Sequence, residues 1–287
     1  MTIELWVLAI LFAAAGGTLL SFWRQYSYSL VASIACVFTL IVMVLVGQSD
    51  WGTTLYQVGF SPHDLTGVDR LYTLLTSVFS HASFLHLFFN VLVILFVGVP
   101  FEQKVGTRPF IGLYLLSGLV GTLVFAAVRW DSGADVVGAS GAVFGVLGAY
   151  ARLYPNERMS LFFLPPMRLL TIVGILFVFQ FLIMVTSPSV AFEAHLGGLA
   201  AGLALAPVLA KRPATGAVKK PATPAALNKF ATTPELKSIL KMIEEETVPD
   251  VRNAWIEHFL SKVKCPHCGS QLRITKDSVM CEKGHLL

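Results

Sequence analysis

A serine and a histidine lie in two apolar, glycine-rich stretches of this 287-residue chain. Ser140 stands in "VVGASGAVFGVLGAYA", residues 136–151, and His195 in "AHLGGLAAG", residues 194–202. Such a pair is the smallest activated nucleophile, because the imidazole takes the hydroxyl proton during attack and returns it to the leaving group. A third, acidic partner is missing, since Glu193 would point elsewhere on a helix that carries His195. The two stretches predict a Ser–His dyad, with the alternative that Ser140 is only a packing residue.

Two more polar residues interrupt the apolar stretch "HASFLHLFFN", residues 81–90. His86 and Asn90 are four positions apart and so share one face of a helix. Both can donate hydrogen bonds to a developing oxyanion, with the Ser140 amide as a third donor. The alternative is that they are ordinary interhelical hydrogen-bonding residues.

The elements that must position these residues are apolar helices. Hydrophobic residues make up 55% of the chain and charged residues 13%, about half the charged share of a soluble domain. A helix needs about 20 apolar residues to cross a bilayer. Charge-free gaps predict seven spans, at residues 5–22, 30–47, 83–100, 109–128, 138–154, 168–185 and 194–210.

The third, fifth and seventh spans enter the membrane from the same side, because successive spans alternate in direction. The four polar residues then lie within about 10 Å of one membrane face, at about 1.5 Å per helical residue. Gly141 and Gly148 share the helix face of Ser140, and Gly198 and Gly202 share that of His195. Small residues at this spacing let two helix backbones approach closely, so the serine and the histidine can come within hydrogen-bond reach.

The distribution of charge indicates the orientation. Residues 1–210 hold eight basic and nine acidic residues, whereas residues 211–287 hold thirteen and eight, a net charge of +5. Basic segments favour the cytoplasmic side. We therefore expect a multi-pass integral membrane protein, in a prokaryotic cell membrane, with the N-terminus outside and the C-terminus cytoplasmic. The loops expected inside carry Arg24, Lys104, Arg108, Arg152, Arg158 and Arg168.

The motifs "HASFLHLFFN", "GASGAVFG" and "AHLGGLAAG" resemble, in order and spacing, the three signatures of the rhomboid intramembrane serine proteases. The resemblance implies an all-α polytopic membrane protein with a six-helix core over residues 30–210. One extra transmembrane helix, within residues 1–29, precedes that core. It also implies Ser140 as nucleophile, His195 as general base and acid, and an oxyanion hole from His86, Asn90 and the Ser140 amide.

The resemblance assigns supporting roles to further residues. His81 is similar to a histidine that braces a loop, Phe144 to an aromatic residue that packs on the catalytic histidine, and Glu102 to an acidic residue that holds a loop. The alternative interpretation of Glu102 is an ordinary solvated charge on a loop. The resemblance also assigns structural roles to four glycines of the motifs, Gly138, Gly141, Gly198 and Gly202. Many family members carry Trp-Arg where this chain has Tyr72 and Thr73, with Arg70 nearby, which puts the anchoring of the outer loop in doubt.

The implied activity is cleavage of transmembrane protein substrates near the outer membrane face, in contact with the lipid bilayer and without a catalytic cofactor. Two alternatives are a non-catalytic protein of the same fold that binds membrane helices, and a membrane acyl hydrolase that uses the same dyad.

A separate domain is expected after the last span. Residues 211–232 mix Pro, Ala, Thr and Lys without apolar periodicity, which predicts a flexible linker. Residues 233–287 begin with a helix capped by Thr233, whose apolar residues are Leu236, Ile239, Leu240 and Ile243. A second amphipathic segment surrounds Val251, Trp255 and Phe259.

The end of this tail carries a candidate metal site. Cys265 and Cys268 form a C-x-x-C pair, and Cys281 and His285 follow with three residues between them. Four such ligands predict one structural zinc ion in a zinc-ribbon-like domain, with a hairpin that turns at Lys276/Asp277. Alternatives are a redox pair, free thiols, or His267 in place of His285. The fourth cysteine, Cys36, is expected to be a small apolar residue.

The partner of the tail is not readable from its sequence. Three roles remain possible for the tail: contact with a cytoplasmic protein, regulatory docking and binding of nucleic acid. Nucleic acid is the least favoured, because juxtamembrane lysines explain part of the basic charge.

Overall fold

The computed structural model describes residues 4–160, 165–186, 190–210, 225–246, 249–275 and 278–285. The chain divides into two compact units, Met1–Gly216 and Ala217–Leu287. We call the first the membrane unit and the second the tail unit. Each is described by itself.

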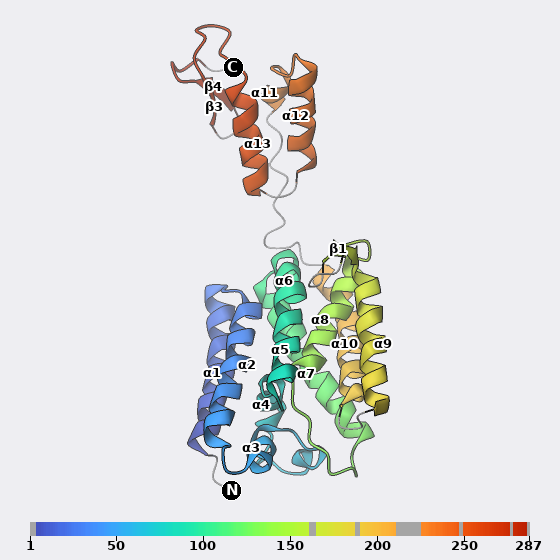
Figure 1. Cartoon of the computed structure of the whole chain (residues 1–287). Coiled ribbons are helices and arrows are strands. Elements are labelled where there is room, and N and C mark those ends of the chain that lie inside the picture. Colours follow the sequence, from blue (N-terminus) through green and yellow to red (C-terminus); the bar gives the residue numbers. More distant parts are fainter. Residues whose placement is uncertain are drawn as a thin grey trace. The chain divides into compact units, whose positions relative to one another are not determined.

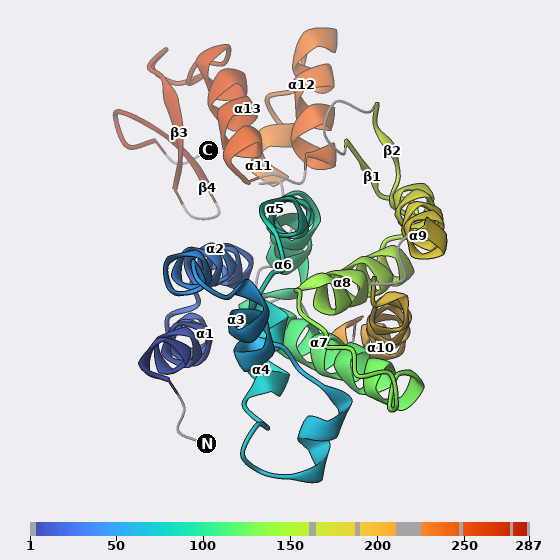
Figure 2. The ribbon, with the colours of Figure 1, turned by 60° about the horizontal axis from the view of Figure 1, so that its bottom comes forward.

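The membrane unit is a bundle of helices (Figures 1 and 2). Its long helical runs are α1 (Leu5–Arg24), α2 (Tyr28–Val46), α5–η2–α6 (Phe84–Val93, Ile94–Gly98, Val99–Val105), α7 (Thr107–Val128), α8 (Ser140–Leu153), α9 (Leu169–Thr186) and α10 (Phe192–Ala210). Between α2 and α5 lie the short helices α3 (Trp51–Val58), η1 (Pro62–Thr66) and α4 (Thr73–Phe79). The strands β1 (Arg158–Met159) and β2 (Met167–Arg168) pair between α8 and α9.

All seven predicted spans fall on helical runs, so the all-α polytopic fold is confirmed. Five of the runs in the described residues are long and apolar enough to cross a membrane by length and composition. The other two predicted spans, α8 with 14 residues and the described apolar part of α9, Leu169–Ile183, are shorter. The run that begins at Phe84 continues past the predicted end at Pro100 to Val105. Pro100 lies inside this run, directly after the π-helical turn η2, in which the N–H of Val99 donates to the carbonyl of Ile94.

The helix that carries Ser140 lies inside the bundle. Every residue of α8 from Gly141 to Ala151 is buried, and α7, α9 and α10 surround it (Figure 2). Helix α10 packs along both α7 and α8. A helix buried on all sides has no need of an amphipathic pattern, which explains why apolar residues occupy every face of α8 between Gly141 and Ala149.

The segment between α2 and α5 folds into α3, η1 and α4. Asp50 caps α3 by accepting the N–H of Thr53 at 3.0 Å. Phe60 is fully buried and forms a β-bridge with Val136. This segment, residues 47–83, is called the L1 segment below.

The tail unit contains α11 (Ala225–Asn228), α12 (Pro234–Glu245), α13 (Pro249–Ser261) and the antiparallel strands β3 (Leu272–Thr275) and β4 (Ser278–Cys281). Thr233 caps α12, since its hydroxyl accepts the N–H of Leu236 at 3.2 Å. The four predicted apolar residues of α12 are all buried. On α13 Phe259 is buried, but Val251 is exposed and so does not belong to the buried face.

The predicted linker, residues 211–232, is wrong at its C-terminal end. Residues 211–224 lie outside the described residues, but α11 begins at Ala225. Leu227 is fully buried in the core of the tail unit, and Phe230 packs against that core. These two apolar anchors begin the tail unit before Thr233, because they bury enough surface to offset the ordering of the chain around them. The predicted turn residues Lys276 and Asp277 lie outside the described residues, but the strands on either side pair as expected.

Candidate active site and metal cluster

Ser140 and His195 meet where two helices begin. Ser140 is the first residue of α8, and His195 lies in the first turn of α10. The Oγ of Ser140 is 2.7 Å from Nε2 of His195, a hydrogen-bond distance. His195 is only 5% exposed, whereas Ser140 is partly exposed. The geometry suits a hydroxyl whose proton can pass to an imidazole.

The two helices approach at paired glycines. A Cβ atom on Gly198 would overlap the carbonyl of Gly141. One on Gly202 would overlap the carbonyl of Gly145. Further along, a Cβ on Gly148 would lie 2.8 Å from the carbonyl oxygen of Leu199. No larger side chain fits at these positions without moving the helix that carries His195.

The ring of His195 is held by Phe144. The two rings stack with centroids 4.8 Å apart and an interplanar angle of 15°. The other ring nitrogen, Nδ1, has no hydrogen-bond partner among the described residues. Glu193 instead pairs with Arg129, Oε1 to Nε, at 2.8 Å. The described residues therefore place no acidic partner on His195, and the catalytic dyad stays a prediction.

His86 and Asn90 lie on α5, close to the residues that precede Ser140. The His86 ring packs over Gly138, because a Cβ on that glycine would lie 2.7 Å from Nε2 of the ring. Gly138 has a φ of +128°, which favours glycine. The Asn90 amide donates to the carbonyl of His86 at 2.8 Å, within its own helix. Their predicted role in an oxyanion hole stays a prediction.

His81 braces the backbone just before Ser140. The N–H of Ala139 donates to Nε2 of His81 at 3.5 Å, and Nδ1 lies 3.3 Å from the carbonyl of Phe79. The histidine is fully buried. It contacts neither Ser140 Oγ nor His195 through any hydrogen bond in the described residues, which fits the supporting role expected of it.

The L1 segment is anchored despite its departure from the Trp-Arg pattern. The Arg70 guanidinium donates to Asp64 at 2.6 Å and to the carbonyl of Tyr56 at 2.6 Å, and it lies 4.0 Å from the Tyr56 ring centroid. The Tyr72 hydroxyl donates to the carbonyl of Gln57 at 3.0 Å. Arg70 therefore supplies the anchor that the sequence left in doubt, from three positions before Thr73.

Glu102 is a buried anchor and not a solvated loop charge. Its carboxylate accepts the N–H groups of Tyr28 and Ser29 at 2.6 and 2.8 Å, and the hydroxyls of Ser27 and Thr107 at 2.9 Å each. A negative charge at the N-terminus of α2 is favoured by the helix dipole.

The tail unit brings three cysteines and a histidine together. Cys265, Cys268, Cys281 and His285 each offer one ligand atom, and these atoms lie within 4.8 Å of one another. Cys268 Sγ is 3.6 Å from Cys281 Sγ, which in turn is 3.3 Å from His285 Nδ1. Tetrahedral zinc with bonds of about 2.3 Å to sulfur and about 2.0 Å to nitrogen separates its ligands by about 3.6 to 3.8 Å. The residues present fit such an ion.

The thiol of Cys268 also suits a metal ion, whereas desolvation raises the pKa of the Cys265 thiol. Hydrogen bonding from Ser270, whose Oγ lies 3.0 Å from the thiol, lowers the pKa of Cys268 to about 6. Thiolates are the form that binds zinc. His267 is not part of the cluster, although its ring centroid lies 5.6 Å from that of His285.

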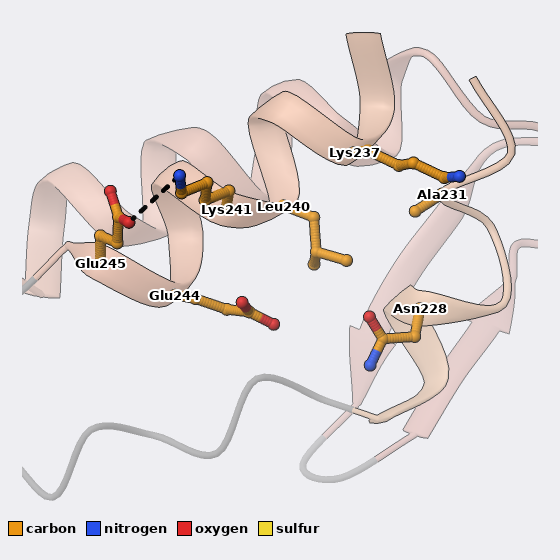
Figure 3. Close-up of a pocket in the computed structure, with 7 residues that line it drawn as sticks. All are labelled: Asn228, Ala231, Lys237, Leu240, Lys241, Glu244 and Glu245. Atoms are coloured by element: carbon orange, nitrogen blue, oxygen red, sulfur yellow. Dashed lines mark ion pairs between the residues drawn. The ribbon is translucent and has the colours of Figure 1, made fainter. Parts of the chain in front are cut away.

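A shallow groove on the tail unit lies between α11 and α12 (Figure 3). Leu240 and Ala231 form its apolar part, and the ion pair between Lys241 and Glu245, 3.8 Å apart, lies on its rim. None of its lining residues is a candidate nucleophile, base or metal ligand. We assign it no role in catalysis or in metal binding.

Two contributions escaped prediction from the sequence. Gly145 was not matched to Gly202, because the spacing of glycines along one helix does not give the register between two helices. Gly121 on α7 belongs to none of the three motifs. A Cβ there would nevertheless lie 2.5 Å from the carbonyl oxygen of Ala194, next to His195. The small-xxx-small pattern of Gly141 and Gly145 is the sequence signal that could have indicated the contact of Gly145 with another helix.

Comparison with known proteins identifies the family. A family model described as "Rhomboid domain" matches residues 68–212, about half of the chain. "RHOMBOID-like protein 5" of Arabidopsis thaliana is 33% identical over 172 residues, 58% of this chain and 52% of that protein. "Rhomboid protease GluP" of Bacillus subtilis is 29% identical over 185 residues, 64% of this chain and 34% of that protein. "Rhomboid-like protease 3" of Toxoplasma gondii is 39% identical over 83 residues, 29% of this chain and 30% of that protein.

The chain thus spans about half or less of the length of these relatives. They come from a plant, a bacterium and Toxoplasma, so the expected prokaryotic membrane stays a prediction. The matched region contains α5 to α10, with all three sequence motifs. The chain belongs to the rhomboid family.

Proposed function

We propose that this chain is an intramembrane serine endopeptidase that uses Ser140 and His195. The observation that carries the proposal is the 2.7 Å separation between Ser140 Oγ and His195 Nε2 at the partly exposed start of α8. Two of the relatives described above are named proteases, which supports the same activity.

In the first step, Ser140 Oγ attacks the carbonyl carbon of the scissile peptide bond while its proton passes to His195 Nε2. The negative charge on the carbonyl oxygen is stabilised by the Ser140 amide and by His86 and Asn90. The C–N bond then breaks, and the imidazole returns the proton to the leaving amine. The stack with Phe144 keeps the imidazole plane fixed while it does so.

In the second step, water attacks the acyl-enzyme ester and His195 again serves as base. Ser140 is partly exposed at the helix start, so water need not cross the whole membrane to reach it. Substrates are transmembrane segments in which small or helix-breaking residues let a peptide bond leave its helical hydrogen bonds.

We propose further that the end of the bundle with Ser140 faces outward. Basic residues gather at the opposite end, where Lys104 pairs with Glu157 at 3.3 Å and Arg108 donates to the carbonyl of Phe22 at 3.1 Å. Positive charge favours the cytoplasmic side. A cysteine introduced at Asp131 should react with an impermeant thiol reagent added outside, and one at Arg158 should not.

The test of the activity is cleavage of a transmembrane reporter in liposomes, with labelling of the protein by a fluorophosphonate. Labelling of the wild type but not of Ser140→Ala, together with cleavage inside a peptide bond by mass spectrometry, supports the peptidase. Labelling with ester hydrolysis alone would indicate the acyl hydrolase. No Ser140-dependent labelling would indicate the non-catalytic helix-binding protein.

For the tail unit we propose one structural zinc ion held by the three cysteines and His285. All four positions are protein ligands, so no position is left open for a reaction. Metal analysis of the full chain should give about one zinc per chain. His285→Ala should lose the zinc ion, while His267→Ala should retain it. The reverse result would mean that His267, and not His285, is the fourth ligand.

A further inference from the structure

Helix α1 lies outside the region matched by the family model, which begins at residue 68. Its N-terminal half is not only lipid-facing. Val7 and Ile10 are buried in an apolar cluster with Met43 of α2 and Val58 of α3. Leu55, Trp51 and Tyr72 of the L1 segment pack against the same cluster. Helix α1 therefore covers one side of the L1 segment.

Two helices of the L1 segment, α3 and α4, are hydrogen-bonded to each other close to the residues that contact α1. The carbonyl of Val58 accepts the hydroxyl of Thr76 on α4 at 2.8 Å. This bond joins the end of α3 to α4, so the two short helices form one hydrogen-bonded piece. Val58 is fully buried and belongs to both the α1 contact and this bond.

From this piece, three successive contacts reach the backbone that leads into Ser140. Phe60 and Val136 exchange two backbone hydrogen bonds, at 3.0 and 2.9 Å. The N–H of Gly138 donates to the carbonyl of Ser77 at 2.8 Å. The N–H of Ala139 then donates to His81, as described above. Residues 136–139 thus lie along the L1 segment.

The same contacts reach the histidine. Phe60 packs in a buried cluster with Val136 and with Ala194, the neighbour of His195. A displacement of the L1 segment would therefore move the backbone before Ser140 and the backbone before His195 together. Without α1, the cluster around Val58 would lose the buried side chains of Val7 and Ile10.

We propose that α1 is a positioning element for the dyad, acting through Ile10 and Val7 on the L1 segment and through residues 136–139 on Ser140. The inference rests on the proposed function, because it concerns the reactivity of Ser140. It assigns to α1 a role besides that of a membrane anchor.

The test compares two alanine variants on the same helix. Ile10 is 0% exposed and faces the cluster, whereas Phe12 is 81% exposed and faces away from the bundle. Ile10→Ala should lower kcat for the reporter by roughly 10- to 100-fold with KM nearly unchanged, since small displacements of reacting groups act on kcat. Its rate of fluorophosphonate labelling should fall in parallel. Phe12→Ala should behave as the wild type, and Ile10→Val should restore most of the rate.

A second pair of variants guards against a folding defect. Val7→Ala removes less side-chain volume and should give a smaller fall in kcat at a temperature well below its unfolding midpoint. The double variant of Ile10→Ala and Val58→Ala should be less harmful than the product of the two single effects, because both act through one contact.

The outcomes separate this inference from the proposed function. If the wild type is labelled at Ser140 and Ile10→Ala is labelled equally fast, α1 is only an anchor and the inference is overturned. Equal losses in Ile10→Ala and Phe12→Ala would overturn it too. If the wild type is not labelled at all, the proposed function itself is wrong.

Discussion

In the membrane unit, Ser140 and His195 meet because two helix backbones touch at glycines, whereas in the tail unit four ligand atoms meet on side chains. Within the membrane there is no hydrophobic driving force between helices, so close van der Waals packing must hold them. The tail unit has a small apolar core, and a core of that size rarely supplies more than about 3–5 kcal/mol. Polar groups are thus brought together by contact between helix backbones in the membrane unit, and by four side chains whose ligand atoms lie within 4.8 Å of one another in the tail unit.

The largest expected effect is on the tail unit after removal of the metal. A structural zinc contributes about 10–16 kcal/mol in small zinc-binding peptides. A strong chelator added to the full chain should therefore raise amide exchange throughout residues 225–246 and 249–285. Cys281→Ser should raise it in the same residues when no chelator is present. Exchange in α7, α8 and α10 should stay unchanged. Equal exchange with and without chelator would contradict the structural role of the cluster.

A smaller effect is expected from a single methyl group in the membrane unit. Gly202→Ala places a Cβ against the carbonyl of Gly145, and overpacking of this kind costs about 1–3 kcal/mol. Its unfolding temperature in detergent and its reporter cleavage should both fall. Gly112→Ala on α7 is the control, because nothing lies within 4 Å of the added atom. Equal behaviour of the two variants would show that the α8–α10 contact is not needed.

The anchor at Glu102 should have an effect comparable with that of the glycine contact and larger than that of a surface charge. Glu102→Gln turns amide hydrogens toward donors from Ser27, Tyr28, Ser29 and Thr107, so we expect a loss of about 2 kcal/mol. Glu157→Gln is the matched control. It removes the charge that pairs with Lys104 in a partly exposed ion pair, worth about 0.5 kcal/mol, while its amide oxygen can still accept the hydroxyl of Tyr150.

Those two values would be compared by thermal unfolding of the membrane unit, with amide exchange at residues 27–30 as a local measure. A loss no greater for Glu102→Gln than for Glu157→Gln would mean that the carboxylate does not cap α2.

The smallest effect is the pH dependence of one exposed ion pair in the tail unit. Lys262 lies 2.7 Å from Glu235, and its hydrogen bond and charge hold the pKa of that carboxyl below the ordinary 4.5. A lowered pKa stabilises the folded form above pH 4.5, and this contribution is lost as the pH falls below it. The difference in unfolding midpoint between wild type and Lys262→Met should thus shrink on acidification. A constant difference would mean that the pair does not contribute.

The sequence could predict what lies along each helix but not what lies between helices. The seven apolar runs, the proximity of Ser140 to His195 and the clustering of three cysteines with His285 could be predicted, because hydrophobicity and residue spacing are properties of one segment. The pairing of Gly202 with Gly145 was not, since register depends on two segments at once. Arg70 escaped for the same reason, as its partners lie up to 14 positions away.

The tail shows the converse limit. The composition of residues 211–232, with its Pro, Ala, Thr and Lys, predicts a linker that includes residues 225–232, yet Leu227 and Phe230 attach these residues to the core of the tail unit. Two apolar side chains in a polar segment form no periodic pattern, so only the surface they meet reveals their role.

The most direct test of the central claim is the rate of transmembrane reporter cleavage by the wild type, Ser140→Ala and His195→Ala in liposomes. If Ser140 Oγ and His195 Nε2 act as a dyad, both variants should lose at least about 10³-fold in kcat. Their unfolding temperatures should stay near that of the wild type, because each change removes few packing atoms. Cleavage by Ser140→Ala at the wild-type rate would contradict the account.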